Sequence, residues 1–470
     1  MAAQLQPYNI IETCHISPPK ATVPSTTLPL TFFDAPWLSL PLADSLFFFS
    51  YQNSTDSFLK DFVPNLKHSL SITLQHFFPY AGKLIIPPRP DPPYLHYNDG
   101  EDSLVFTVAE STETDFDQLK SDSPKDISVL HGVLPKLPPP HVSPEGIQMR
   151  PIMAMQVTIF PGAGICIGNS ATHVVADGVT FSHFMKYWMS LTKSSGKDPA
   201  TVLLPSLPII HSCRNIIKDP GEVAAGHLER FWSQNSAKHI SHVTPENMVR
   251  ATFTLSRKQI DNLKSLVTEQ SENQSPVSTF VVTLAFIWVS LIKTLVQDSE
   301  TKANEEDKDE VFHLMINVDC RNRLKYTQPI PQTYFGNCMA PGIVSVKKHD
   351  LLGEKCVMAA SDAITARIKD MLSSDLLKTA PRWGQGVRKW VMSHYPTSIA
   401  GAPKLGLYDM DFGLGKPCKM EIVHIETGGS IAFSESRDGS NGVEIGIALE
   451  KKKMDVFDSI LQQGIKKFAT

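Results

Sequence analysis

Apolar residues recur at the spacing of an amphipathic helix in three segments of this chain. The first segment stops at the Phe78-Pro79 pair, the second follows Gly178, and the third closes the chain. Each pattern predicts a helix with one buried face. The apolar positions are Phe58, Phe62, Leu66, Leu70 and Leu74 in the first, Phe181, Phe184, Met185, Trp188 and Leu191 in the second, and Met454, Phe457, Leu461, Ile465 and Phe468 in the third.

A fourth segment, Val277–Ile292, carries no charge and is apolar around the whole circumference of a helix. Its sixteen residues fall short of the ~20 that span a bilayer. We therefore expect a helix that is buried on all sides in a protein core, and no membrane association.

Strands are predicted where short apolar runs flank turn residues. Two hairpins are expected, and a further strand follows the acidic loop at 304–310. Proline-rich stretches predict loops at 87–93 and 135–151, and the first 30 residues are expected to lie along the surface before Leu28 enters the fold. The predicted strands are Met155–Phe160 with Ile165–His173, Ser430–Ser436 with Val443–Leu449, and Val311–Val318.

A segment with several prolines and no period, 194–221, divides the chain into two halves. We interpret it as a crossover linker between an N-terminal domain at 1–193 and a C-terminal domain at 222–470. The predicted strands do not alternate with helices regularly enough for a parallel doubly wound sheet. The expected fold is therefore α/β with mixed sheets.

Composition narrows the class of protein. The chain has 470 residues, of which 42% are hydrophobic, and a formal net charge of -4. This length fits two or three domains with a sizeable core, and the charge argues against a nucleic-acid binder. Seven cysteines without a CxxC pair, and an N-terminus without a signal-peptide pattern, favour reduced thiols and a cytoplasmic location.

The strongest candidate for chemistry is the run His173-Val-Val-Ala-Asp177-Gly178. The histidine lies where a predicted strand ends, and the aspartate opens the next helix. Such a histidine can exchange a proton near pH 7. The spacing alone is weak evidence, and Asp177 could instead be only an N-cap, a role that contributes about 1 kcal/mol.

Other chemistries have less support. The segment 168–172 lacks the second glycine of a serine-hydrolase elbow, and His173, Asp177 and His183 are not part of a zinc-binding pattern, so no metal is expected. The segment Gly413–Cys418 lacks the third glycine of a dinucleotide-binding loop, and Pro417 falls where its helix should begin. No phosphate-binding GxxxxGK[ST] loop is present.

Several motifs together resemble one family. His173–Asp177 and Asp411-Phe-Gly-Leu-Gly415 are similar to the HxxxD and DFGWG signatures of the BAHD family of plant acyl-CoA-dependent acyltransferases. Tyr334-Phe-Gly-Asn-Cys338 resembles the YFGNC motif of the branch that acylates anthocyanins and other flavonoid or phenolic glycosides. Phe32-Phe33-Asp34 with Trp37, Phe78–Leu84 and Asn317–Arg321 add to the likeness, which spans nearly the whole chain. Leu414 stands where the family usually has Trp, and we expect a packing change there.

The resemblance implies two chloramphenicol-acetyltransferase-like domains with a channel between them. His173 would act there as a general base on a sugar hydroxyl, with acyl-CoA as co-substrate and no permanently bound cofactor. Asp177 is expected to pair with a buried arginine, most plausibly Arg321. Asp411 is either a participant at the site or an anchor for the turn that contains Gly413 and Gly415.

The substrates stay open at this stage. A malonyl donor needs a cation for its carboxylate, for which His183, Lys186, Lys404 and Arg437 are candidates. A hydroxycinnamoyl donor needs an apolar pocket, which part of the 181–188 stripe could border. Further candidates for contact with substrate are Phe33, Trp37 and Phe412 as an aromatic wall, Asn337, and Lys416 or Arg437 against the phosphates of CoA. A catalytically silent relative that binds phenolics is the alternative, and we expect a monomer in either case.

Overall fold

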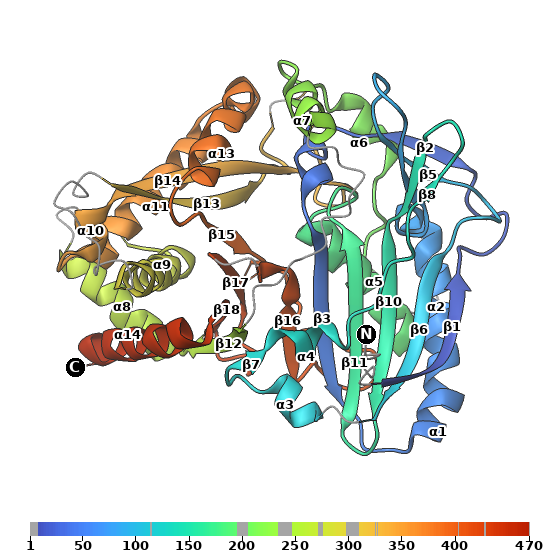
Figure 1. Cartoon of the computed structure of the whole chain (residues 1–470), viewed down its shortest axis with the longest axis horizontal. Coiled ribbons are helices and arrows are strands. Elements are labelled where there is room, and N and C mark those ends of the chain that lie inside the picture. Colours follow the sequence, from blue (N-terminus) through green and yellow to red (C-terminus); the bar gives the residue numbers. More distant parts are fainter. Residues whose placement is uncertain are drawn as a thin grey trace.

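The framework of the protein is three β-sheets (Figure 1). The computed structural model describes residues 8–469 except 113–114, 195–204, 234–246, 271–275, 298–309, 325, 327, 403 and 427–428. The first sheet has the order β1 (Tyr8–Ile16), β6 (Leu104–Ser111), β10 (Met153–Phe160), β11 (Gly164–Thr172), β3 (Leu42–Ser50), β16 (Lys419–Ile422). The second has the order β14 (Met339–Lys347), β13 (Val311–Asp319), β15 (Thr397–Ala400), β17 (Ser430–Glu435), β18 (Val443–Glu450), β12 (Met248–Leu255), β7 (Lys125–Asp126). The third has the order β2 (Thr26–Pro29), β5 (Tyr94–Tyr97), β4 (Lys83–Ile86), β9 (Gln148–Pro151), β8 (His141–Val142).

Both large sheets are mixed, as predicted. In the first sheet β6 and β10 are parallel, whereas β10 and β11 form the predicted antiparallel hairpin, in which Phe160 is opposite Gly164. In the second sheet β15 is parallel to both β13 and β17, and the predicted hairpin β17–β18 is antiparallel. Every residue of β10 is buried, because this strand lies in the interior of the sheet with side chains packed on both faces.

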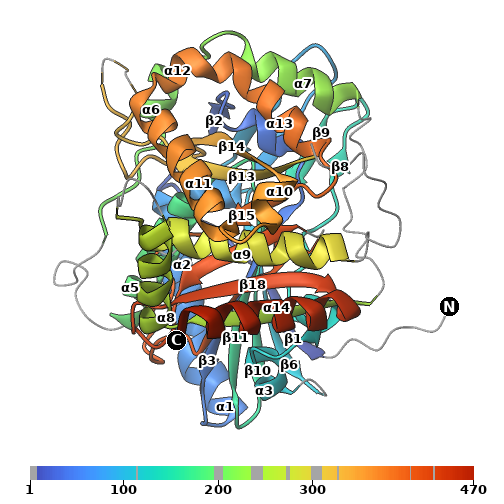
Figure 2. The ribbon, with the colours of Figure 1, turned by 90° about the vertical axis from the view of Figure 1, so that its left-hand side faces the viewer.

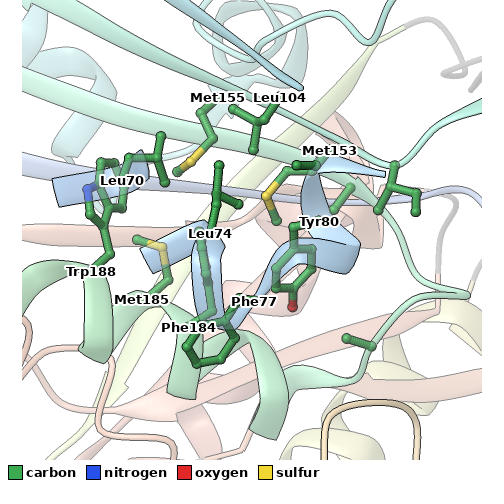
Figure 3. Close-up of a cluster of buried hydrophobic side chains, with 14 of the residues drawn as sticks. Leu70, Leu74, Phe77, Tyr80, Leu104, Met153, Met155, Phe184, Met185 and Trp188 are labelled. Carbon is green, nitrogen blue, oxygen red and sulfur yellow. The ribbon is translucent and has the colours of Figure 1, made fainter. Parts of the chain in front are cut away.

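The helices predicted at 58–76 and 181–191 pack together against the first sheet. They are α2 (Val63–His76), preceded by the π-helical turn Phe58–Phe62, and α5 (Gly178–Lys193). Figure 3 shows Phe184, Met185 and Trp188 of α5 among side chains from α2 and the sheet. The apolar stripe of α5 is therefore part of the protein core, and its fully buried members cannot border an acyl pocket.

Helices that pack on the core of the second sheet include α8 (Arg257–Gln270), α9 (Thr279–Gln297), α11 (Cys356–Ser373) and α14 (Lys451–Ala469) (Figure 2). In the described part of the chain, α9 is the one helix with the length and composition of a membrane span, but 78% of its apolar window is buried inside the protein. It is the predicted core helix. The predicted face of α14 also packs on this core.

Each half of the chain contributes one strand to the sheet of the other half. The strand β16 pairs with β3 of the first sheet, and β7 pairs with β12 of the second. Buried charges hold this exchange together: Arg250 on β12 donates from Nε to Glu421 on β16 at 2.6 Å, and Lys125 lies 3.6 Å from the same carboxylate. The strands β7 and β16 therefore both cross the predicted domain division at 194–221. Part of that linker, 195–204, lies outside the described residues.

The first 30 residues lie along the surface as expected, but they already contain β1, a largely exposed edge strand of the first sheet, and β2. The expectation of a loop at 135–151 is wrong in part. The proline-rich stretch 135–151 contains the short strands β8 and β9. Edge strands face solvent along much of their length and need no regular apolar alternation. The sequence of these segments therefore lacks the pattern from which a strand is predicted. The acidic loop 304–310 lies largely outside the described residues, and the strand after it is β13.

Candidate active site

His173 follows directly after β11, in the short turn that leads into α5. The last residues of β11 are held in the sheet by pairing with β3, so the strand fixes where the histidine emerges. The indole of Trp37 stacks on the imidazole of His173, with ring centroids 3.6 Å apart and planes inclined by 8°. Trp37 belongs to the 3-10 helix η1 (Ala35–Ser39), so residues far apart in sequence form this pair.

The surroundings of His173 keep its imidazole neutral. Burial lowers the pKa of His173 below its ordinary value, and this outweighs its own backbone carbonyl and the carboxylate of Asp177, which act in the opposite direction. The Nδ1 atom is enclosed and has no hydrogen-bond partner among the described residues. This leaves Nε2 as the nitrogen that can meet a substrate. A neutral imidazole is the form that accepts a proton.

The carboxylate of Asp177 points away from His173's ring and into the protein. Arg321 binds it through two parallel hydrogen bonds, Nη1 to Oδ2 at 2.9 Å and Nη2 to Oδ1 at 3.0 Å. The backbone N–H groups of Thr180 and Cys338 each donate to it at 3.0 Å. Asp177 therefore has both of the roles considered for it: it is the N-cap of α5 and the ion-pair partner of the predicted arginine.

Arg321 connects the two halves of the chain at this point. Besides binding Asp177, its Nη2 donates to the carbonyl oxygens of Tyr334 at 3.2 Å and Gly336 at 2.9 Å. Both charged side chains are completely buried. In a dry environment a bidentate pair with further hydrogen bonds is geometrically rigid. The pair positions the His173 turn and is inaccessible to a substrate.

Sequence reasoning missed a second buried ion pair next to the first. Asp34 accepts a hydrogen bond from Arg214 at 2.9 Å, and both side chains are at most 1% exposed. Asp34 also accepts from the backbone N–H and the hydroxyl of Thr31. Its place in the Phe32-Phe33-Asp34 motif was a signal, but a charge partner 180 residues away has no local pattern.

Asn337 was predicted to contact substrate, and this is wrong because its side chain is fully buried. Its Nδ2 lies within hydrogen-bond distance of Asp34 Oδ1 at 3.0 Å, of the carbonyl of His173 at 3.0 Å and of that of Val174 at 3.2 Å. Asn337 therefore joins the backbone of the His173 turn to the segment that bears Trp37.

Phe33 and Phe412 do not form an aromatic wall for a substrate. Phe33 is buried against Phe32 and Trp383, at ring distances of 4.1 and 6.1 Å. Phe412 is buried edge-on against Trp188 at 4.8 Å. Of the three aromatic candidates only Trp37 reaches His173, because its ring lies beside the imidazole.

Asp411 was counted among the candidate catalytic residues, with an anchor for the glycine turn as its other candidate role, and its position supports the anchor. Its Oδ2 accepts from Lys193 Nζ at 2.5 Å, at the C-terminal end of α5. Asp177 caps the other end of this helix, about 22 Å away at 1.5 Å per residue. Asp411 Oδ1 accepts the N–H groups of Gly413 and Gly415 at 2.8 and 2.9 Å. Both glycines have positive φ, 96° and 87°, so Asp411 anchors a turn that needs glycine.

The two cations proposed for the phosphates of CoA are paired with carboxylates. Lys416 is exposed and bonds to Asp409 at 2.9 Å. Arg437 donates from Nε to Glu444 at 2.5 Å and from Nη2 to Asp122 at 2.6 Å. The pair of carboxylates holds Arg437 at the junction of the two large sheets, so its predicted role in binding is not supported by this geometry.

Comparison with known proteins agrees with the motifs. A model of the transferase family matches residues 8–463. The chain belongs to this family, the BAHD acyltransferases. It is an enzyme that transfers acyl groups, and its α/β fold with mixed sheets is that of solved members of the family. The structure of vinorine synthase matches with a TM-score of 0.67 at 18% identity, covering 96% of each chain. That of F. graminearum TRI101 complexed with ethyl coenzyme A matches with a TM-score of 0.62 at 14% identity, covering 92% of this chain and 96% of the other.

Two relatives define the branch of the acyltransferase family. The chain is 97% identical, over the full length of both proteins, to coumaroyl-CoA:anthocyanidin 3-O-glucoside-6''-O-coumaroyltransferase 1 of Arabidopsis thaliana. It is 34% identical to malonyl-coenzyme A:anthocyanin 3-O-glucoside-6''-O-malonyltransferase of Dahlia pinnata, over 97% of each chain. Acyltransferases with different donors therefore share this framework.

The position of Asp411 leads to a first prediction for this acyltransferase. We expect Asp411→Ala to cost about 1–3 kcal/mol of stability, because it removes charge-assisted hydrogen bonds at the glycine turn, and to leave kcat within about threefold. Asp411→Asn keeps an acceptor oxygen and serves as the milder control. Urea unfolding measured beside steady-state turnover tests this, and a large loss of kcat at unchanged stability would restore the catalytic assignment.

Proposed function

We propose that this enzyme transfers a coumaroyl group from coumaroyl-CoA to the 6'' hydroxyl of the sugar of an anthocyanidin 3-O-glucoside. The observation that carries the proposal is the 97% identity, across the whole chain, to an enzyme named for that reaction. The intact His173 turn supports it, because a histidine with a lowered pKa is suited to act as a general base.

The reaction follows from these groups. Nε2 of His173 removes the proton of the sugar hydroxyl as its oxygen attacks the thioester carbonyl. A tetrahedral oxyanion forms and collapses, the carbon–sulfur bond breaks, and the proton on the imidazole passes to the departing CoA thiolate. The thioester is already activated, so no covalent acyl-enzyme is required. General-base assistance of this kind contributes about 10²–10⁴-fold.

Three of the four cations considered for a malonyl donor are engaged elsewhere, which supports the aromatic donor. Lys186 donates to the carbonyl of Leu405 at 2.6 Å, and Arg437 is held by two carboxylates. His183 bonds to the carbonyl of Ser206 at 2.6 Å, and burial lowers its pKa. Lys404 is exposed. A malonyl carboxylate without a partner is disfavoured in a closed site, whereas a coumaroyl group carries no such charge.

We expect coumaroyl-CoA to outcompete malonyl-CoA by about 10- to 150-fold, the effect of a missing charge-assisted hydrogen bond of about 1.5–3 kcal/mol. The measurement is a competition with equal donor concentrations and an anthocyanidin 3-O-glucoside, with both products quantified by mass spectrometry.

Lys186→Met is the matched variant for this competition, because it removes the ammonium group of Lys186 and keeps an apolar side chain of similar length. The donor ratio should stay unchanged in this variant. Efficient malonyl transfer by the wild type, lost selectively in Lys186→Met, would contradict the proposed donor.

A silent phenolic-binding protein is the second candidate function. Release of CoA thiol in the presence of glucoside separates the two, because a binding protein leaves the thioester intact. The arrangement of His173 and Asp177 favours the enzyme.

A further inference from the structure

The imidazole of His173 lacks the partner that usually orients a catalytic histidine. Such a base is commonly held by a hydrogen bond from its second ring nitrogen to an acid. Here Nδ1 has no hydrogen-bond partner within the described residues. The nearby acid, Asp177, is turned toward Arg321 and has its oxygens occupied by four donors. Something other than a carboxylate must fix the ring.

Trp37 stacks on the ring, beside the side chain of Asn337 and the backbone of His173 itself. Its indole is nearly parallel to the imidazole, 3.6 Å away between centroids. A parallel stack at this distance restricts rotation of the imidazole about its χ2 bond and shields one face from water. The stack exists because two distant segments, η1 and the turn after β11, lie side by side.

One buried group holds both members of the stack. Asp34 precedes η1 and is fixed by Arg214 at 2.9 Å, which sets the position of Trp37. The side chain of Asn337 bonds to Asp34 and also to the backbone carbonyl of His173. Asp34 and Asn337 therefore fix the indole and the imidazole relative to each other, and the distance between the two rings does not depend on a flexible loop.

We propose that Trp37 is a positioning residue, which orients the imidazole of His173 and stabilises its protonated form during acyl transfer, and is not a wall of the acceptor pocket. The proposal rests on the proposed function only through the role of His173 as the base. The face of an indole attracts a cation. The imidazole becomes positive only as the reaction proceeds, so this attraction is larger in the transition state than in the ground state and raises kcat.

The other charges around the ring are compensated. The carboxylates of Asp177 and Asp34 both favour the protonated imidazole, but each is bound to a buried arginine, Arg321 and Arg214 respectively. Their fields are thus largely neutralised at the ring. The indole, by contrast, is in direct contact with the imidazole.

The test compares Trp37→Phe, which keeps a weaker aromatic face, with Trp37→Leu, which keeps an apolar side chain without one. We expect kcat to fall in the order Trp, Phe, Leu, by about 2- to 30-fold for leucine, with KM for both substrates within about twofold. NMR titration of His173, assigned with His173→Gln, should give its pKa in the same order, lowest in Trp37→Leu. Phe33→Leu is the matched control, because Phe33 lies on the same segment and packs against Trp383 without touching the imidazole.

Three results would overturn the role of Trp37. A rise in KM for the glucoside at unchanged kcat would make Trp37 an acceptor contact. An unchanged or raised pKa of His173 in Trp37→Leu would remove the cation-stabilising role. A loss of thermal stability and activity equal to that in Phe33→Leu, without the change in pKa, would make Trp37 structural. The titration does not depend on turnover. If the wild-type protein transfers no coumaroyl group, that result refutes the proposed function but leaves the titration as a test of Trp37.

Discussion

Replacing His173 with alanine is expected to lower the rate of acyl transfer by about 10²–10⁴-fold, because it removes the general base. His173 lies in a turn between β11 and α5, and its side chain takes no part in the ion pairs that join the two halves of the chain. The variant should therefore stay folded and still bind CoA. Steady-state turnover, a thermal melt and calorimetric titration with CoA provide the measurements.

The wild-type pH profile supplies a second readout for the same residue. Only neutral imidazole acts as a base, so activity falls as the pH drops through the pKa of His173. Burial lowers this pKa, and an exposed histidine titrates at about 6.5. The acid limb of kcat/KM should therefore have its midpoint below pH 6.5. A folded His173→Ala enzyme with wild-type turnover, or an acid limb centred well above 6.5, would remove the assignment.

Replacing Asp177 with alanine is expected to cost about 3–5 kcal/mol of stability, because it leaves the buried guanidinium of Arg321 without its carboxylate. The N-cap of α5 is lost as well. Activity should fall with stability, since the cap and the ion pair fix the turn that carries His173. Asp177→Asn retains a capping oxygen and should recover part of the stability but not the ion pair. Urea unfolding and turnover are measured for both variants.

A double-mutant cycle between Asp177 and Arg321 isolates their interaction. We expect Arg321→Met combined with Asp177→Asn to be less destabilised than the sum of the single variants, because the double variant buries no unpaired charge. The exposed pair Arg257–Asp261, at 2.9 Å on α8, is the matched control, for which solvent screening should leave little or no coupling. Purely additive losses at Asp177 and Arg321 would show that the pair does not act as a unit.

Local patterns predicted the elements that make the core. The apolar spacing in 58–76, 181–191 and 454–468 corresponds to helices α2, α5 and α14, and the runs at 155–173 and 430–449 are the two hairpins. These predictions succeed because burial of one face of a helix or strand imposes a period on the sequence. The same argument fails for β1, β8 and β9, which are edge or short strands with few buried positions.

The motifs located the turn of the active site but not the role of each member. His173, Asp177 and the partner Arg321 were found from the order of the motifs, and the Asp177–Arg321 pairing is present at 2.9 Å. Asn337, Phe33 and Arg437 were taken for substrate contacts, and the motif left two roles open for Asp411, a participant at the site or an anchor for the glycine turn. A motif marks residues that matter together, but it does not say which of them contact substrate.

The sequence by itself determined that this chain is an α/β acyltransferase, and it predicted His173 as the base, because these features depend on side-chain periodicity and on short motifs. Only the tertiary structure decided that Trp37 stacks on His173, that Asp34 and Arg214 form a buried pair, and that β7 and β16 exchange between the sheets. Each of these contacts joins residues more than a hundred positions apart. The energy of such contacts depends on how close the two groups lie in the folded protein and on how deeply they are buried. Contacts of this kind produce no regular spacing of residues along the chain.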